Sequence, residues 1–224
     1  MTNVSRFELR GVQAWPTMFF LRNWDRFSAY QQPLIDFLVG LQANQEETLS
    51  SGVGDDAKAA NGLYEGDFDL FKRDDIPLQE LVRFIRCTLA SAVCIANQES
   101  KPQDLLVEFP DSWYHITNQH GFHDAHWHHG CSWCGIFYVR LGSAGKRVSK
   151  GAPNGGSRFY NPILCGGSYR DFGNKYLMSS MDAPIEDGML LLFPSFLLHS
   201  GLPYTGQEDR IVIAFNAKVF LRSE

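Results

Sequence analysis

Short apolar runs separated by turn-forming residues fill the chain from residue 105 to residue 219. Six of these runs have the length and composition of strands, at residues 105–109, 112–117, 134–141, 157–160, 189–193 and 211–219. Many short strands joined by glycine-rich turns fold as a closed barrel or as two packed sheets. The sequence therefore predicts a mainly β architecture for this part of the chain.

Helices are expected upstream of the strands. Residues 15–21 read as an opening strand, and Pro33 in a first helical turn introduces Leu34, Leu38 and Leu41 at helical spacing. The polar stretch 43–56 is expected to be a loop, and Pro77 to begin a longer helix with one apolar stripe. We expect these two helices to brace the β structure.

Composition limits the classes of partner. Hydrophobic residues at 44% and aromatic residues at 13% suffice for a sizeable core. A net charge of −5 argues against a broad nucleic-acid footprint, which needs clustered Lys and Arg. The start of the sequence has no signal-peptide pattern, and no apolar run approaches the roughly 20 residues of a membrane span. These features favour a cytoplasmic protein without a membrane partner.

The five cysteines are expected to be free thiols. Cys131 and Cys134 have Cys-x-x-Cys spacing, but the sequence has no second such pair to complete a zinc site. Cys87 and Cys94 lie in the predicted second helix, where small core residues are the expected role. The glycine-rich stretch 142–156 lacks phosphate-loop spacing and is expected to form a surface hairpin or lid.

Histidine is concentrated at one place in the sequence. Six of the seven histidines fall between His115 and His129, and His199 follows about seventy residues later. Imidazoles at i and i+2 of an extended chain point to one side, so His126 and His128 can share a metal with His199 if the sheet curls round. Neutral imidazole suits iron, zinc, copper and nickel, and a facial triad with open positions is typical of non-haem Fe(II) oxygenases.

Arg210 opens the apolar run that follows His199. A guanidinium binds a carboxylate in bidentate fashion, so Arg210 is a candidate anchor for a 2-oxo acid that chelates the metal. We expect His199 and Arg210 to lie on neighbouring antiparallel strands joined by the turn-rich stretch 200–209. A surface ion pair with Glu208 or Asp209 is the alternative for Arg210.

Other histidines compete for these roles. Asp124 at i−2 from His126 could supply a carboxylate ligand, and His123 or His129 could replace a chosen ligand or bind substrate. His115 on a strand and His120 in a turn are expected to be solvated or capping residues.

A set of ordered motifs resembles the small 2-oxoglutarate/Fe(II) oxygenases built on a double-stranded β-helix, a jelly-roll or cupin-like barrel. The motifs are His126-x-His128, Gly-Ile-Phe-Tyr-Val at 135–139, Phe-Tyr-Asn-Pro at 159–162, Gly188-x-Leu-x-Leu-Phe-Pro-Ser-x-x-x-His199 and Arg210-x-x-x-x-Phe-Asn216. The similarity is strongest over residues 113–216 and continues weakly upstream at residues 61–64 and 69–72. It implies one oxygenase domain over 1–224, with a strand and bracing helices in 1–104 and the β-helix core in 105–220.

The resemblance also implies chemistry. His126, His128 and His199 would bind Fe(II), and Arg210 and Tyr138 would hold 2-oxoglutarate. A small-molecule or peptide substrate would be hydroxylated by dioxygen, with release of succinate and CO2. Two departures stand out: His128 replaces the Asp or Glu usual in the wider superfamily, and Val212 replaces a Ser that commonly contacts the co-substrate. A three-histidine cupin-type dioxygenase or metal-binding barrel without 2-oxoglutarate is the alternative, and a non-catalytic binding module is a third.

Overall fold

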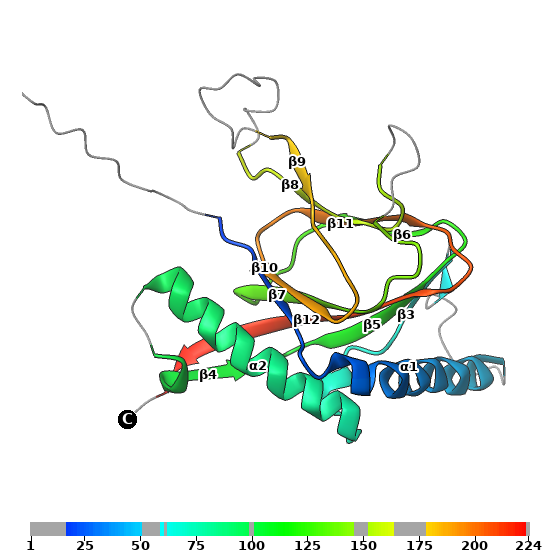
Figure 1. Cartoon of the computed structure of the whole chain (residues 1–224), viewed down its shortest axis with the longest axis horizontal. Coiled ribbons are helices and arrows are strands. Elements are labelled where there is room, and N and C mark those ends of the chain that lie inside the picture. The colour runs from blue at the N-terminus through cyan, green and yellow to red at the C-terminus, as the bar shows by residue number, and fades with distance from the viewer. Residues whose placement is uncertain are drawn as a thin grey trace, which may run out of the picture.

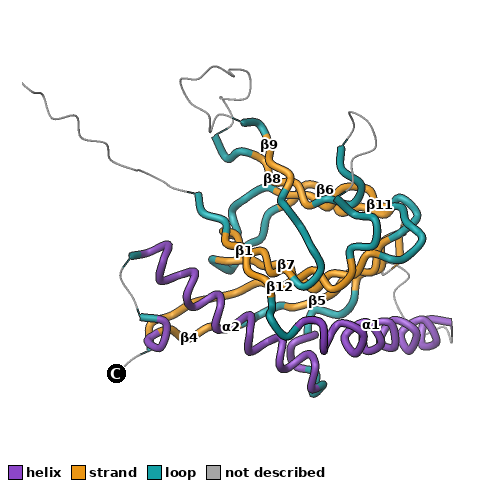
Figure 2. Tube along the Cα trace, in the orientation of Figure 1, coloured by secondary structure: helices purple, strands orange, loops and turns teal. Residues whose placement is uncertain are grey.

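The computed structural model describes residues 17–50, 59–60, 62–98, 101–145, 152–163 and 178–222, with the side chains of 45–50 and 59–60 left out. Two antiparallel sheets face each other across an interior (Figures 1 and 2). The large sheet runs in the order β1 (Phe20–Asn23), β10 (Met189–Pro194), β7 (Trp133–Arg140), β12 (Arg210–Leu221), β5 (Ser112–Thr117), β3 (Leu63–Glu65) and β2 (Ala59–Ala60), and β4 (Leu105–Glu108) pairs with the far end of β12. The small sheet runs β6 (Gly121–His126), β11 (His199–Tyr204), β8 (Ser157–Tyr160) and β9 (Ser180–Asp182).

All six predicted strands are present, with ends that differ by no more than two residues. The opening strand lies further along the chain than expected, at Phe20–Asn23, and residues 15 and 16 are outside the described residues. β6 and β11 were not predicted. Both have polar or turn-forming residues at many positions, so their sequences show no strand pattern. They form strands because their backbones pair with each other through hydrogen bonds.

Two helices cover the outer face of the large sheet (Figure 1). α2 (Ile76–Asn97) begins as predicted, with Pro77 in its first turn and the Asp75 side chain accepting a hydrogen bond from the Leu78 amide. The prediction for α1 (Phe27–Ser50) is wrong at both ends. The helix begins before Pro33, which lies inside it, and residues 43–50, expected to be a loop, are helical. Phe27, which precedes Pro33, packs edge-on against Phe137 of the sheet. This contact stabilises the helical turns before Pro33, although the proline removes one backbone hydrogen bond.

The large sheet separates two apolar cores because side chains alternate along its strands. On β12, Ile211, Ile213 and Phe215 face the helices in the larger core. Val212 on the same strand faces the small sheet and packs in a second core with Tyr138 and other residues of the barrel interior. Each central strand therefore has one face in the helix-backed core and one face in the barrel.

The four described cysteines are free thiols, as predicted, and Cys165 lies outside the described residues. Cys131 Sγ lies 3.9 Å from Cys134 Sγ, at hydrogen-bond distance and without a disulfide. Cys87 is exposed and Cys94 partly buried, so the expected core role is wrong for Cys87, whose side chain lies on the solvent side of α2.

Residues 146–151 of the predicted surface hairpin are outside the described residues, but its two ends meet, since the Gly145 amide donates to the Asn154 carbonyl at 2.7 Å. Among the described residues, no helix combines the length and the apolar character needed to cross a bilayer.

Candidate active site

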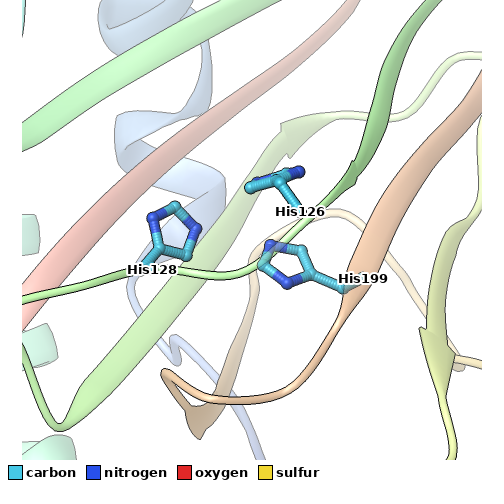
Figure 3. A group of neighbouring side chains, drawn as sticks. All are labelled: His126, His128 and His199. Atoms are coloured by element: carbon cyan, nitrogen blue, oxygen red, sulfur yellow. The ribbon is translucent and has the colours of Figure 1, made fainter.

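Three histidines converge at one end of the barrel interior. His126 is the last residue of β6, and His128 lies two residues later, after the strand has ended. His199 is the first residue of β11 and pairs with His126 in the β6–β11 register. Their nearest ring nitrogens lie within 4.8 Å of one another, and the rings face a common centre (Figure 3). This spacing allows the three imidazoles to share one metal ion.

The expected strand arrangement around His199 is wrong. Residues 199–204 form a strand of the small sheet, pairing with β6 and β8, where the sequence suggested a turn. His199 and Arg210 therefore stand on different sheets and approach the pocket from opposite walls, because β12 belongs to the large sheet.

Backbone carbonyls fix the tautomers of two of these rings. His199 Nδ1 lies 2.9 Å from the Leu197 carbonyl, and His126 Nδ1 lies 2.7 Å from the Asp124 carbonyl. A carbonyl only accepts, so each Nδ1 carries a proton and each Nε2 keeps its lone pair. A metal-binding histidine needs this arrangement, with its second nitrogen donating to a fixed acceptor.

Burial also keeps the three imidazoles neutral. Loss of hydration lowers the pKa of His199 to about 3 and that of His128 to about 4, and burial lowers the pKa of His126 as well. At neutral pH no proton competes for the nitrogen lone pairs, which is the protonation state that metal binding requires.

Arg210 lies on the opposite wall of the same pocket. It begins β12 paired with Thr117, is 6% exposed, and its Nε has no hydrogen-bond partner among the described residues. Burial lowers the pKa of the guanidinium, whose carbon lies 5.7 Å from the centre of the Tyr138 ring. Arg210 forms no ion pair with the described Glu208 or Asp209, so the surface salt bridge considered above is absent.

A buried cation without an acceptor is costly unless a ligand supplies one. Thr117 is 2% exposed and also lines the pocket, and within the described part of the chain its hydroxyl has no hydrogen-bond partner. Two adjacent unsatisfied donors thus face the pocket from neighbouring strands. Their chemistry fits a carboxylate.

Tyr138 is wholly buried and lies behind this wall. Its hydroxyl donates to Ser157 Oγ at 2.8 Å, and Ser157 itself lines the pocket. Val212 lines the pocket too, and its side chain brings no hydrogen-bonding group.

A second polar cluster adjoins the three histidines. Glu65, His115 and His123 also bring their ligand atoms within 4.8 Å of one another. His115, expected to be solvated, is buried: its Nε2 lies 2.7 Å from Glu65 Oε2 and 3.1 Å from Trp113 Nε1. The hydrogen bond to His115 lowers the pKa of Glu65, which therefore stays ionised. Glu65 was missed because its only sequence signal is its place two residues after Leu63 on a short strand.

The remaining candidates lie apart from the three converging rings. Asp124 is exposed and its carboxylate accepts from the Ala125 amide at 2.7 Å. His129 is exposed beside Trp127, with ring centroids 5.9 Å apart. His120 lies in a turn with φ of 67° near the Thr205 hydroxyl, as expected for a solvent-facing residue.

Comparison with known proteins identifies the kind of fold. The structure is similar to a prolyl-4-hydroxylase of Pseudomonas putida, with TM-score 0.52, 11% identity and coverage of 89% of this chain and 92% of that one. It is similar to SnoN, a non-heme alpha ketoglutarate dependent epimerase from nogalamycin biosynthesis, with TM-score 0.58, 9% identity and coverage of 92% and 81%. It is also similar to HygX of Streptomyces hygroscopicus, solved with nickel and 2-oxoglutarate bound, with TM-score 0.50, 14% identity and coverage of 90% and 83%.

These likenesses confirm the double-stranded β-helix. No curated protein matches the sequence. A family model described as "Putative 2OG-Fe(II) oxygenase" matches residues 111–216, the segment that holds the three histidines and Arg210. In this segment the chain is similar to the 2OG-Fe(II) oxygenases, enzymes that depend on Fe(II) and 2-oxoglutarate.

Proposed function

We propose that the chain hydroxylates a small-molecule substrate, with His126, His128 and His199 holding Fe(II) through one nitrogen each and Arg210 binding the distal carboxylate of 2-oxoglutarate. The observation that carries this proposal is the buried guanidinium of Arg210, whose Nε has no acceptor among the described residues and which lines the same pocket as three neutral imidazoles. A pocket that binds only a metal gains nothing from a buried unpaired cation.

Three protein ligands would leave coordination positions open for a 2-oxo acid and dioxygen. Fe(II), when bound, supplies the redox chemistry by which substrate, 2-oxoglutarate and dioxygen become hydroxylated substrate, succinate and CO2. The contribution of the chain is positional. Arg210 fixes the far end of the acid, so that its 2-oxo end is presented toward the three histidines.

The groups behind Arg210 have supporting roles in this proposal. Thr117 donates its free hydroxyl to the same carboxylate. Tyr138 contributes to co-substrate binding by holding the guanidinium against its ring face and by orienting the Ser157 hydroxyl at the pocket wall. Together these groups replace the hydrogen bond that Val212 does not make.

The test follows succinate formation by the Fe(II)-loaded protein with 2-oxoglutarate and pooled metabolites. We expect succinate from the wild type and none from His199→Ala. Oxygen uptake without a 2-oxoglutarate requirement would favour the three-histidine cupin-type dioxygenase. Metal binding with no turnover and no 2-oxoglutarate binding would favour a binding module.

A further inference from the structure

The three-histidine set leaves the metal site without a carboxylate. A divalent ion bound by two histidines and one carboxylate carries a net charge of +1, whereas three neutral histidines leave +2. Asp124 does not join the set, because it is exposed and its carboxylate accepts a hydrogen bond from the Ala125 amide. Glu65 is the carboxylate that the fold places against the histidine cluster.

The strand pairing brings Glu65 there. β3 pairs with β5 so that Glu65 lies opposite His115, and Glu65 Oε2 lies 2.7 Å from His115 Nε2. The same oxygen lies 3.8 Å from His123 Nε2. His123 stacks on His115 with ring centroids 5.3 Å apart, and its Nδ1 lies 3.0 Å from Nδ1 of His126. His123 thus stands between a carboxylate and a proposed metal ligand.

Proton positions follow from these contacts. His126 Nδ1 carries its proton because it also donates to the Asp124 carbonyl, so His123 Nδ1 must accept. A neutral His123 that accepts at Nδ1 carries its proton at Nε2, which faces Glu65. His126 thus donates to His123, and the Nε2–H of His123 interacts electrostatically with the Glu65 carboxylate at 3.8 Å.

We propose that Glu65, acting through His123, supplies from outside the coordination sphere the negative charge that the three-histidine set lacks. Glu65 and His123 are positioning residues: they fix the ring of His126 and make its free nitrogen more basic. This inference rests on the proposed role of His126, His128 and His199 as metal ligands.

The geometry favours this role over a second metal site at Glu65, His115 and His123. Ligands at 2.0–2.2 Å from one ion lie roughly 3 Å or more apart, whereas the Glu65–His115 contact of 2.7 Å is a hydrogen bond. A metal on His123 Nε2 would move that proton to Nδ1, where it would meet the proton of His126 at 3.0 Å.

The test measures metal binding directly, with Co(II) as an air-stable probe in calorimetric titration, and the Fe(III)/Fe(II) reduction potential of the iron-loaded protein. Glu65→Gln removes the charge but keeps the shape, and should weaken Co(II) binding by about 10- to 100-fold and raise the potential. Glu65→Asp should restore part of both. Glu80→Gln on α2, whose carboxylate pairs with Arg26 outside the pocket, is the matched control and should change neither.

A relay also predicts non-additivity. His123→Phe should weaken metal binding like Glu65→Gln, and the double variant should lose little more than either single one, because each change breaks the same chain. Additive losses would contradict the relay. If Glu65→Gln does not fold, as judged by circular dichroism, Glu65→Asp and His123→Phe still decide the question.

The outcomes separate this inference from the proposed function. Wild type should bind one equivalent of Co(II) and His199→Ala none; if the wild type binds no metal, the proposed function fails. If the wild type binds metal and Glu65→Gln has the same affinity and potential, only the role of Glu65 is overturned. Two equivalents in the wild type, of which Glu65→Gln loses one, would establish a second metal site and also overturn the relay.

Discussion

Replacing Arg210 with methionine should separate co-substrate binding from metal binding and from folding. Methionine fills much of the volume of the arginine stem without its charge. The guanidinium lies on the opposite sheet from His126 and His199, so the three histidines keep their contacts and metal affinity should not change. The 2-oxoglutarate dissociation constant should rise steeply.

The magnitude follows from burial. Arg210 is 6% exposed and its Nε has no partner in the described segments, so its contact with a carboxylate forms in a nearly dry pocket. Loss of one member of such a charged pair costs about 2–5 kcal/mol, which weakens binding by roughly 30- to 4,000-fold. In the ligand-free protein the same substitution should not lower the free energy of unfolding and should raise it, because the variant no longer buries an unpaired charge at the cost of its hydration. The apo variant should therefore melt at the same temperature as the wild type or higher, by about 2–4 °C for each kcal/mol gained.

Calorimetric titration of Co(II)-loaded protein with 2-oxoglutarate measures the first effect, and thermal unfolding of apo protein measures the second. Arg140→Met is the control, since Arg140 already donates to the Asp209 carbonyl and lies outside the pocket lining. Arg210→Lys should recover only part of the affinity, because an ammonium lacks the planar fork. If Arg210→Met binds 2-oxoglutarate like the wild type, Arg210 is not the anchor. If the variant melts well below the wild type, the guanidinium has a structural partner in the folded protein.

Three further predictions concern the same pocket. His128→Ala should lose most bound Co(II) while Asp124→Ala retains it, and full retention by His128→Ala with loss by Asp124→Ala would replace one proposed ligand by the other. Thr117→Val should weaken 2-oxoglutarate binding by the roughly 1.5–3 kcal/mol of a hydrogen bond to a charged group, with no change in metal affinity; unchanged 2-oxoglutarate affinity would exclude Thr117 from the carboxylate site. The apo protein should lose stability as the pH falls from about 6.5 toward 4, because the unfolded chain protonates His199 and His128 near the ordinary value of 6.5 while burial lowers their pKa values to about 3 and about 4 in the folded chain. Melting temperatures across this range test it, and a flat profile would contradict the neutral, buried state of these rings.

The sequence predicts the parts of the fold whose pattern is local. The six strands have period-two or continuous apolar patterns, and α2 has Pro77 at its start and one apolar stripe. α1 was misplaced because Pro33 is a strong local signal for a helix start, whereas packing of Phe27 on the sheet is a tertiary contact. β6 and β11 could not be predicted because they also depend on a tertiary contact: their residues form strands only by pairing with each other.

In the candidate site, too, the features with a local sequence pattern could be predicted and those that depend on tertiary contacts could not. The spacing of His126 and His128 and the placing of His199 and Arg210 can be read from the chain, and the structure brings all four to one pocket. The sequence could not show Glu65 beside His123, because the two meet only through the β3–β5 pairing and the turn after β5. Nor could it show that the Thr117 hydroxyl is left without a partner, which depends on every group around it.

The position of β12 in the large sheet has a consequence for synthesis of the protein. β12 lies between β5 and β7, although β5 ends at Thr117 and β12 begins only at Arg210. Until β12 leaves the ribosome, both neighbouring strands present unpaired edges, which invite association with other chains. Pairing across such a separation in sequence is also slow. The wall that carries Arg210 is therefore completed late, and partly synthesised chains should depend on chaperones more than the finished barrel does.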